Sequence, residues 1–592
     1  MKSKISLFNS GLFKSSLRRF WPLWIAHFGG WFIFMPVLTL VNSLGPSHES
    51  GYVYYITENA IFISSVIACV MGLLAAMAVF SFMYNSRGTG LIAALPVQRE
   101  AVFGSAWLGS AAAVIISNLI IALLTFLFSL GTVENTALAF KTVCIWFGVY
   151  SMQFILFFGI ASLIAVFTGS IVVLPVLFAI FNFFAVGMEY VIRLFFSFFV
   201  WGMSNVDSTG VFDFLSPVVN MLGNFDLTIV YYIGNDEVNL VREVYYENWV
   251  PTIIYCAVGI LMSVAALMIF RKRKMEAAGG VIAVPCLRPV FKYGTAVCSA
   301  LCGGMLLFVV IDSLFNNRSV SALIMIPCMI LFVFIGYFGA KMLLKKSFHV
   351  FRGSWVGFIV TCCLCAVFTL CCDLDVFNIG GFVPDEDDVK SMVVYYDQDI
   401  QNAESISEFR SLQEKIVSQK DKYKNLSDAD VDNITATFTY KLKSGRTVSR
   451  AYILPYEDEN YTEYCNLLNS PAIVLEYYSA SVPVDTDNCS GADFSDSYFN
   501  YAFSLSPEQA VDFYENAVVA DIKAGNLKIV DDSDYLGSVS FYLGSDNGDA
   551  EDGYEMLSVD ITTGCTECLS WIKDNCNIDL AEAYASLFSE AE

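Results

Sequence analysis

Few residues in this chain could carry out catalytic chemistry. Only three of its 592 residues are histidines, at positions 27, 48 and 349. The sequence has no H-E-x-x-H zinc motif, no G-x-S-x-G nucleophile motif and no G-x-x-x-x-G-K-[ST] phosphate-binding loop. An intramembrane enzyme is therefore disfavoured, and the chain is not expected to bind ATP by the Walker mechanism itself. We expect no cofactor in this chain.

The cysteines offer a second kind of chemistry. Of 17 cysteines, 12 lie in or beside long apolar runs, and five lie near the C-terminus, at Cys465, Cys489, Cys565, Cys568 and Cys576. The Cys565-x-x-Cys568 spacing could hold a metal, but no histidine follows position 349. A structural disulfide or idle thiols are therefore favoured over zinc, and the odd count leaves at least one thiol without an intramolecular partner.

Glu189, Asp312 and His27 lie within or at the ends of apolar runs, where an unpaired charge is costly. Glu189 is followed four residues later by Arg193, a spacing that predicts an ion pair at the outer interface. We place Asp312 near the outer end of its run, and His27 in the outward part of the first run. For each residue, a solvated or paired interface position is favoured over a substrate-binding one.

One short loop segment, from Gly90 to Phe103, combines apolar residues with adjacent opposite charges. Its sequence is amphipathic and is predicted to face the cytoplasm, where a partner protein could contact it. The candidate contact residues are Leu95, Pro96, Arg99, Glu100 and Phe103.

The elements around this segment are predicted to be membrane spans. Hydrophobic residues make up 56% of the chain, charged residues 15%, and the mean hydropathy is +0.57, which excludes an ordinary soluble multidomain enzyme. Nine apolar runs are long enough to cross a bilayer. They cover about 21–43, 60–84, 101–131, 143–168, 170–192, 249–270, 294–315, 321–344 and 354–372. The fourth and fifth runs are separated only by Thr168, Gly169 and Ser170, which form either a tight turn or a break within one bent hairpin.

The positions of the cations predict the orientation. With the N-terminus inside, the inner segments of the membrane body hold 17 Lys and Arg residues, and the outer loops hold four. The first apolar run has no cleavage pattern, which predicts an uncleaved span. Before it, apolar and basic residues alternate with the spacing of an interfacial helix over residues 1–20, although a plain basic flank is the alternative.

The formal net charge of −23 divides unevenly along the chain. Residues 1–372 carry a net charge of +7, whereas residues 373–592 carry −30. The acidic part would repel nucleic acid, so no nucleic-acid partner is expected. The predicted order is a six-span body over 21–270, a loop with three further spans over 271–372, a linker over 373–388, and an acidic extracytoplasmic domain over 389–592.

This acidic domain has a mixed α+β pattern. Strands are predicted near 393–396, 434–442, 447–454, 537–543 and 555–562, with a hairpin turn at Ser444-Gly445. Helices are predicted over 403–419, from Pro507 to about 524, and near 566–575. In the membrane body, the small residues Ser105 and Gly109, and Gly336 and Ala340, predict close helix contacts.

Several segments together resemble a known family. The stretch Leu95-Pro96-Val97-Gln98-Arg99, continuing to Val102-Phe103, resembles the loop of ABC-2-type transporter permeases that couples the membrane subunit to its ATPase. Residues 193–248, with the apolar run Leu194 to Trp201, are similar to the surface or re-entrant helices between the fifth and sixth spans of that family. The segments 271–279, 287–292 and 440–452 resemble a Ytr-type bacterial subgroup, which adds three spans and an extracytoplasmic domain.

The resemblance implies a plasma-membrane permease subunit of bacteria that works with separate ABC ATPase subunits, which bind ATP and magnesium. A second permease subunit, identical or different, and membrane lipid are the other implied partners. The implied activity is export of an apolar or amphipathic compound, or a role in the response to cell-envelope or antimicrobial stress. The alternative is a membrane sensor whose outer domain binds an envelope ligand.

Overall fold

The computed structural model describes most of the chain. The described residues are 8–45, 51–94, 96–133, 135–203, 212–233, 239–273, 280–315, 321–351, 353–394, 398–424, 426, 433–479, 483–486, 488–496, 502–530, 533–543, 555–582 and 584. They divide into two compact units. Unit 1 comprises residues 1–192, 208–308 and 326–366, and unit 2 comprises 193–207, 309–325 and 367–592.

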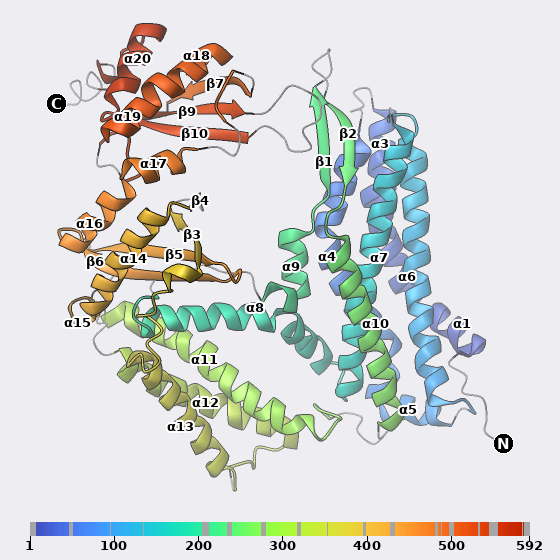
Figure 1. Cartoon of the computed structure of the whole chain (residues 1–592). Helices are drawn as coiled ribbons and strands as arrows, with labels where there is room; N and C mark the ends of the chain where they lie inside the picture. The colour runs from blue at the N-terminus through green and yellow to red at the C-terminus, as the bar shows by residue number, and fades with distance from the viewer. Residues whose placement is uncertain are drawn as a thin grey trace. The chain divides into compact units, whose positions relative to one another are not determined.

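Among the described residues, nine helical segments are long and apolar enough to cross a membrane, which confirms the number of predicted spans (Figure 1). They cover Trp21–Leu44, Tyr52–Val79, Arg99–Ser129, Thr136–Phe167, Val173–Phe199, Trp249–Lys272, Leu287–Leu314, Ala322–Lys345 and Trp355–Asp373. The first contains α2 (Trp21–Phe32), the π-helical turn η1 (Ile33–Val37) and α3 (Leu38–Leu44). The others are α4 (Tyr52–Val79), α6 (Arg99–Ser129), α7 (Thr136–Phe167), α8 (Val173–Phe199), α10 (Trp249–Lys272), α11 (Leu287–Phe315), α12 (Ser321–Lys345) and α13 (Trp355–Asp373).

Several of the predicted span boundaries are wrong. The second span is predicted over 60–84, but α4 covers Tyr52–Val79, because polar residues such as Glu58 are accommodated within the helix. Helices α7 and α11 begin at Thr136 and Leu287, each seven residues before the predicted start. The apolar run from Leu194 was predicted to begin a separate surface segment, but it continues α8 as far as Phe199. The break between the fourth and fifth spans is a turn, since α7 ends at Phe167 and α8 begins at Val173.

Helix α7 lies at the centre of unit 1, packed between α4 and α10. A Cβ on Gly159 of α7 would lie 2.1 Å from the carbonyl oxygen of Gly259 in α10, so only glycine permits this approach. On the other side, a Cβ on Gly72 of α4 would lie 2.8 Å from the Phe157 backbone. Small residues therefore set the distances between the three helices, as close packing in apolar surroundings requires.

The predicted small-residue contacts are also found. Ser105 and Gly109 of α6 pack against α1 (Ser10–Arg19), where the Asn9 main-chain N–H donates to the Ser105 hydroxyl over 2.6 Å. A Cβ on Gly336 of α12 would lie 2.6 Å from the Ser299 side chain of α11. The predicted N-terminal helix is thus present from Ser10, whereas its first seven residues lie outside the described part.

Further short elements complete unit 1. They are the 3-10 turn η2 (Ser81–Tyr84), α5 (Ser86–Ala93), the turn η3 (Asp213–Leu215), α9 (Pro217–Asn224), and a hairpin of β1 (Thr228–Ile233) and β2 (Asn239–Tyr245). The sequence prediction did not include this hairpin.

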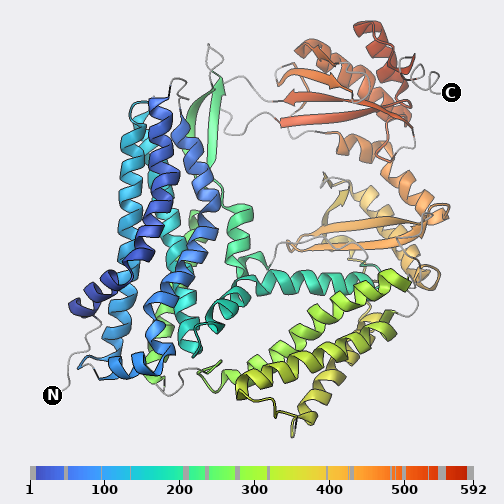
Figure 2. The ribbon, with the colours of Figure 1, turned by 180° about the vertical axis from the view of Figure 1, so that it is seen from behind.

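Unit 2 contains two four-stranded antiparallel sheets, each with helices on one face (Figure 1 and Figure 2). The first has the strand order β4-β3-β5-β6 and includes β3 (Val389–Val394), β4 (Gln398–Ile400), β5 (Asn433–Leu442) and β6 (Thr447–Pro455). Its core also contains residues from α14 (Ala403–Ser418), α15 (Lys420–Tyr423) and α16 (Glu459–Leu468). Helix α17 (Pro471–Tyr477) leads to the second sheet.

The second sheet, in the order β8-β7-β9-β10, repeats this arrangement. Its strands are β7 (Cys489–Ser495), β8 (Ala502–Leu505), β9 (Tyr535–Leu543) and β10 (Glu555–Thr562). Its helices are α18 (Pro507–Phe513), which continues through the π-helical turn η7 (Tyr514–Val518) into α19 (Val519–Ala524), and α20 (Thr566–Cys576). Most predicted strands and helices of the acidic domain are confirmed, including the hairpin at Ser444-Gly445 and Pro507 in the first turn of its helix.

The two halves of unit 2 agree in detail as well as in strand order. The first strand of each sheet has a register shift at the same place, between Val389 and Ser391 in one and between Cys489 and Gly491 in the other. Both strands also show the same alternation of buried and exposed positions. We therefore describe them as repeat 1 (residues 389–468) and repeat 2 (residues 489–576), two copies of one ββαββα fold.

A cross-strand hydroxyl pair occurs at equivalent positions in both copies. Thr439 and Ser449 lie 2.8 Å apart in repeat 1, and Ser540 and Ser558 lie 2.9 Å apart in repeat 2. The register of each sheet places these pairs at the same distance from the bulge. The sequence prediction treated this region as a single domain, because the repeats share a pattern of burial more than they share residues.

Candidate functional site

The candidate partner-binding segment contains a short helix, α5, between the second and third apolar helices. The Thr89 hydroxyl lies within hydrogen-bonding distance of the Phe82 and Asn85 carbonyl oxygens, at 2.9 and 2.8 Å, and so holds α5 against η2. Leu91 on α5 is 72% exposed, and Pro96 after it is exposed. Leu95 lies outside the described residues. The segment therefore presents apolar side chains on the surface of unit 1.

Arg99 and Glu100 begin α6, directly after this segment. The Arg99 guanidinium donates to the carbonyl oxygens of Arg273, at 3.1 Å, and Arg271, at 3.4 Å. The Glu100 carboxylate forms an ion pair with Arg271 at 3.0 Å, and it lies in the first turn of α6, where a negative charge is favourable. Both predicted residues thus contact the end of α10, while Arg99 stays exposed.

Arg273 connects this contact to α7. Its guanidinium donates to the carbonyl oxygens of Ala165, at 3.2 Å, and Thr168, at 3.0 Å. The residue is 7% exposed, and this burial lowers the pKa of Arg273 from its usual value. The buried guanidinium donates hydrogen bonds to two carbonyl groups at the end of α7. These bonds hold the end of α10 against the end of α7.

The chain that follows Arg273 is joined to the same helix end. The Gly169 N–H donates to the Gly280 carbonyl oxygen at 2.9 Å, and the Ala283 N–H donates to the Phe167 carbonyl oxygen at 2.7 Å. The Thr168 hydroxyl donates to the Val281 carbonyl oxygen at 2.9 Å. We call residues 99–100, 165–169, 271–273 and 280–283 the basal junction.

Phe103 has a different position from the other predicted contact residues. It is 2% exposed, stacks on Phe80 with ring centroids 4.8 Å apart, and lies 5.7 Å from the Phe270 ring. Its side chain therefore packs against α4 and α10 inside unit 1. It could transmit a displacement of α6, but its ring is not at the surface.

His27 is not where the sequence prediction placed it. It lies only six residues after the start of the first span, in the half that is predicted to be cytoplasmic, and it is 7% exposed. Its Nε2 lies 3.0 Å from the Asn118 side-chain oxygen, and its ring stacks on Tyr150. Asn118 in turn donates to Ser151, so the network joins the first, third and fourth spans. His27 is thus paired, as predicted, but in the core and not at an interface.

An apolar groove of about 430 Å³ lies between α2 and α4, beside this network. Its lining residues include Leu23, Phe34, Val66 and Leu74, with His27 as the main polar member. A groove of this composition suits an apolar compound that has few hydrogen-bonding groups.

The remaining sequence candidates lie outside the basal junction. Cys565 precedes α20 and Cys568 lies in its first turn, and both are buried. Within the described residues, no group of three or more His, Cys, Asp or Glu side chains could hold a metal ion. The Glu189–Arg193 ion pair and the outer position of Asp312 stay predictions.

Sequence reasoning did not identify Arg273 or Thr168 as members of the junction. The cluster Arg271-Lys272-Arg273-Lys274 predicts an inner loop, over 271–292, on which a partner ATPase would also push, but composition cannot show which of its cations is buried. For Thr168, the only indication in the sequence was its position in a Thr168-Gly169 turn directly after an apolar helix.

In comparisons with known proteins, no family model, no curated protein and no solved structure matches the chain.

Proposed function

We propose that this protein is the membrane-spanning permease subunit of an ATP-driven ABC transporter. The observation that carries the proposal is the basal junction. A surface segment with a short helix, α5, leads directly into Arg99 and Glu100, and these contact the ends of α10 and, through Arg273, α7. A push on the α5 segment by a partner would therefore act on three packed apolar helices together.

The energy source would be a separate ATPase subunit that holds ATP and magnesium. Closure of two such subunits would displace the segment around Pro96 and tilt α6, α7 and α10 relative to α4. Two permease bodies, from this chain or from a second one, would complete the transporter. The cargo would be an apolar or amphipathic compound, in keeping with the apolar groove between α2 and α4.

The first experiment is a pull-down of the tagged chain from native membranes in mild detergent, with an assay for vanadate-sensitive ATP hydrolysis in the eluate. A co-purifying ATPase supports the transporter. A preparation without ATPase activity, also after crosslinking in membranes, contradicts it and favours the sensor.

Charge-reversal variants then test the coupling role. Arg99→Glu with Glu100→Arg should abolish stimulation of the partner ATPase by the permease. Because Glu100 also pairs with Arg271, the Glu100→Arg, Arg271→Glu variant restores that internal pair and separates internal stability from partner contact. Lys345→Glu, an exposed cation at the end of α12, is the matched control. An unchanged ATPase rate in the Arg99/Glu100 reversal would overturn the coupling role.

A further inference from the structure

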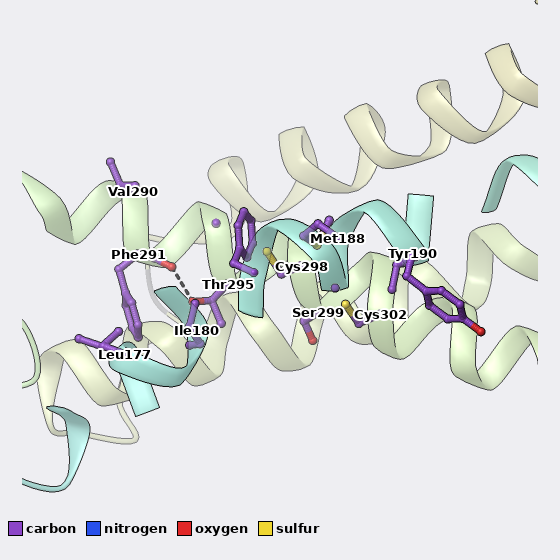
Figure 3. A pocket seen from close by; sticks show the side chains of 14 residues that line it. Leu177, Ile180, Met188, Tyr190, Val290, Phe291, Thr295, Cys298, Ser299 and Cys302 are labelled. Atoms are coloured by element: carbon purple, nitrogen blue, oxygen red, sulfur yellow. Dashed lines mark hydrogen bonds between the residues drawn. The ribbon is translucent and has the colours of Figure 1, made fainter. Parts of the chain in front are cut away.

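A second apolar groove, of about 800 Å³, lies in unit 1 between α8 and α11 (Figure 3). The α8 wall includes Leu177, Ile180 and Met188, and the α11 wall includes Phe291, Thr295 and Cys298. The Thr295 hydroxyl donates to the Phe291 carbonyl oxygen at 2.6 Å, so its hydrogen bond is satisfied within the helix. This hydroxyl is therefore already paired, and most of the other lining residues are apolar.

The two helices run in the same direction along the groove. Figure 3 shows Leu177 at the same end as Phe291, and Tyr190 toward the end that holds Cys302. This agrees with the predicted topology, in which α8 and α11 both start on the cytoplasmic side. From Val290 to Cys302 the α11 wall extends about 18 Å, at about 1.5 Å per residue.

This length corresponds to one leaflet of a bilayer. The hydrocarbon core is about 30 Å thick, so one leaflet accounts for about 15 Å of it. A groove of this length matches a single acyl chain better than a path across the membrane.

A cation lies at the start of the groove. Arg288 is exposed and lies on the same face of α11 as Phe291, Thr295 and Cys298, two residues before the apolar lining begins at Val290. An anionic headgroup is therefore attracted at the start of the groove.

We propose that the α8–α11 groove binds an acidic phospholipid from the cytoplasmic leaflet of the surrounding bilayer. Its acyl chain lies along Phe291, Thr295 and Cys298, and its phosphate lies against Arg288. Lys292, one turn further on, is held by Tyr337 of α12, to whose hydroxyl it donates over 3.3 Å, and adds positive charge nearby. Basic residues beside a groove between helices are a known arrangement for acidic lipids.

The test uses the full chain in phosphatidylcholine vesicles that contain either photoactivatable phosphatidylglycerol or photoactivatable phosphatidylcholine, each with a diazirine in the acyl chain. Peptides that cover 177–191 and 290–302 should carry the label, with phosphatidylglycerol preferred. Arg288→Gln should reduce that preference about fivefold, as expected for the loss of one cation at the headgroup. Lys345→Gln removes an equal charge elsewhere and should leave the preference unchanged.

A second pair of variants fills the groove. A Cβ added at Gly294 or at Gly339 meets nothing within 4 Å, so we expect both positions to accept leucine. Gly294→Leu occupies the groove and should abolish labelling there, whereas Gly339→Leu on α12 should not. Label spread evenly over the exposed faces of α4 and α6, or crosslinks from the groove to a second copy of the chain, would overturn the proposal. An unchanged phosphatidylglycerol preference in Arg288→Gln would do the same.

Discussion

The Arg99 guanidinium donates to the carbonyl oxygen of Arg273 over 3.1 Å, across 174 residues of sequence. The same Arg273 uses its own guanidinium for the carbonyl groups of Ala165 and Thr168. Two arginines in series thus connect the start of α6, the end of α10 and the end of α7. Because all three hydrogen bonds end on main-chain oxygens, they fix the ends of the helices and not only side chains.

Replacement of Arg273 should weaken this connection strongly. Arg273→Gln leaves at least one buried carbonyl group without its donor, and loss of charge-assisted hydrogen bonds of this kind costs about 1.5–3 kcal/mol. Thermal unfolding of the purified protein in detergent would show a lower midpoint. Lys272→Gln, at an exposed neighbouring cation, is the control; equal midpoints for the two variants would contradict a structural role for Arg273.

The crossing of α7 and α10 depends on Gly159 and Gly259. Gly159→Ala would place a methyl group 2.1 Å from the Gly259 carbonyl oxygen, so the helices must separate. Overpacking of this kind costs about 1–3 kcal/mol, and the yield of monodisperse protein should fall. Gly30→Ala in α2, where the new methyl group meets nothing within 4 Å, should behave as the wild type. If both variants purify alike, the close approach is not required.

The sequence was sufficient to predict the features that depend on a local pattern of residues. Apolar run length predicted nine spans, and alternation with turn residues predicted the β5–β6 hairpin around Gly445, which has a positive φ of 79°. It was not sufficient where a residue's role depends on a distant partner. Nothing local distinguishes the buried Arg273 from the exposed Lys272, or the packed Gly159 from the open Gly30.

The duplication in unit 2 shows the same limit. Val389 and Cys489 occupy equivalent positions beside the bulge, and Thr439 and Ser540 occupy equivalent positions in the hydroxyl pairs. These pairs preserve burial and hydrogen bonding but not residue identity. Strand pairing was needed to align the repeats, and strand pairing is a long-range property.

In repeat 1, strand β6 contacts the segment that directly follows α8. The Ala451 N–H donates to the Gly202 carbonyl oxygen at 3.0 Å, and the Trp201 ring lies 4.8 Å from that of Tyr452. Trp201→Ala should release this segment from β6 and speed amide hydrogen exchange at Ala451. Trp355→Ala, at a half-exposed ring in α13, should leave it unchanged. Full protection at Ala451 without Trp201 would show that the ring does not hold the segment.

The stability of repeat 1 should depend on pH through Asp458. Burial alone raises the pKa of Asp458, but hydrogen bonds from Lys422, the Asn460 N–H and Tyr423 outweigh it, so the pKa lies below its usual 3.8. The ionised carboxylate therefore stabilises the folded chain at neutral pH, and this contribution is lost as the pH falls through the lowered pKa.

Hydrogen exchange in the first turn of α16, measured in the full chain, should therefore accelerate below about pH 4. Asp458→Asn should exchange faster at neutral pH and lose this dependence. Asp399→Asn is the control, because the Asp399–Lys441 pair is substantially exposed and contributes little. A wild-type profile that is flat in acid would refute the role of Asp458.

Repeat 2 secures its last helix with a carboxylate from a different element. Asp521 of α19 is fully buried and accepts the N–H groups of Glu567, at 3.1 Å, and Cys568, at 2.8 Å, in the first turn of α20. In repeat 1 the corresponding carboxylate, Asp458, caps its own helix, α16, and Lys422 and Tyr423 contact it from α15. Both copies therefore join their two helices through one carboxylate, although its position in the sequence differs.

Asp521→Ala should consequently detach α20 from α19 and leave both N–H groups without an acceptor. Loss of a helix cap costs about 0.5–2 kcal/mol, and burial of the unpaired donors adds to this cost. Exchange should accelerate at residues 567–572, while α16 in repeat 1 keeps its protection. Asp521→Asn, which retains one acceptor oxygen, should lie between wild type and Asp521→Ala. If Asp521→Ala loosens α16 as much as α20, the two repeats unfold as one unit, and the carboxylate is not a local connection between helices.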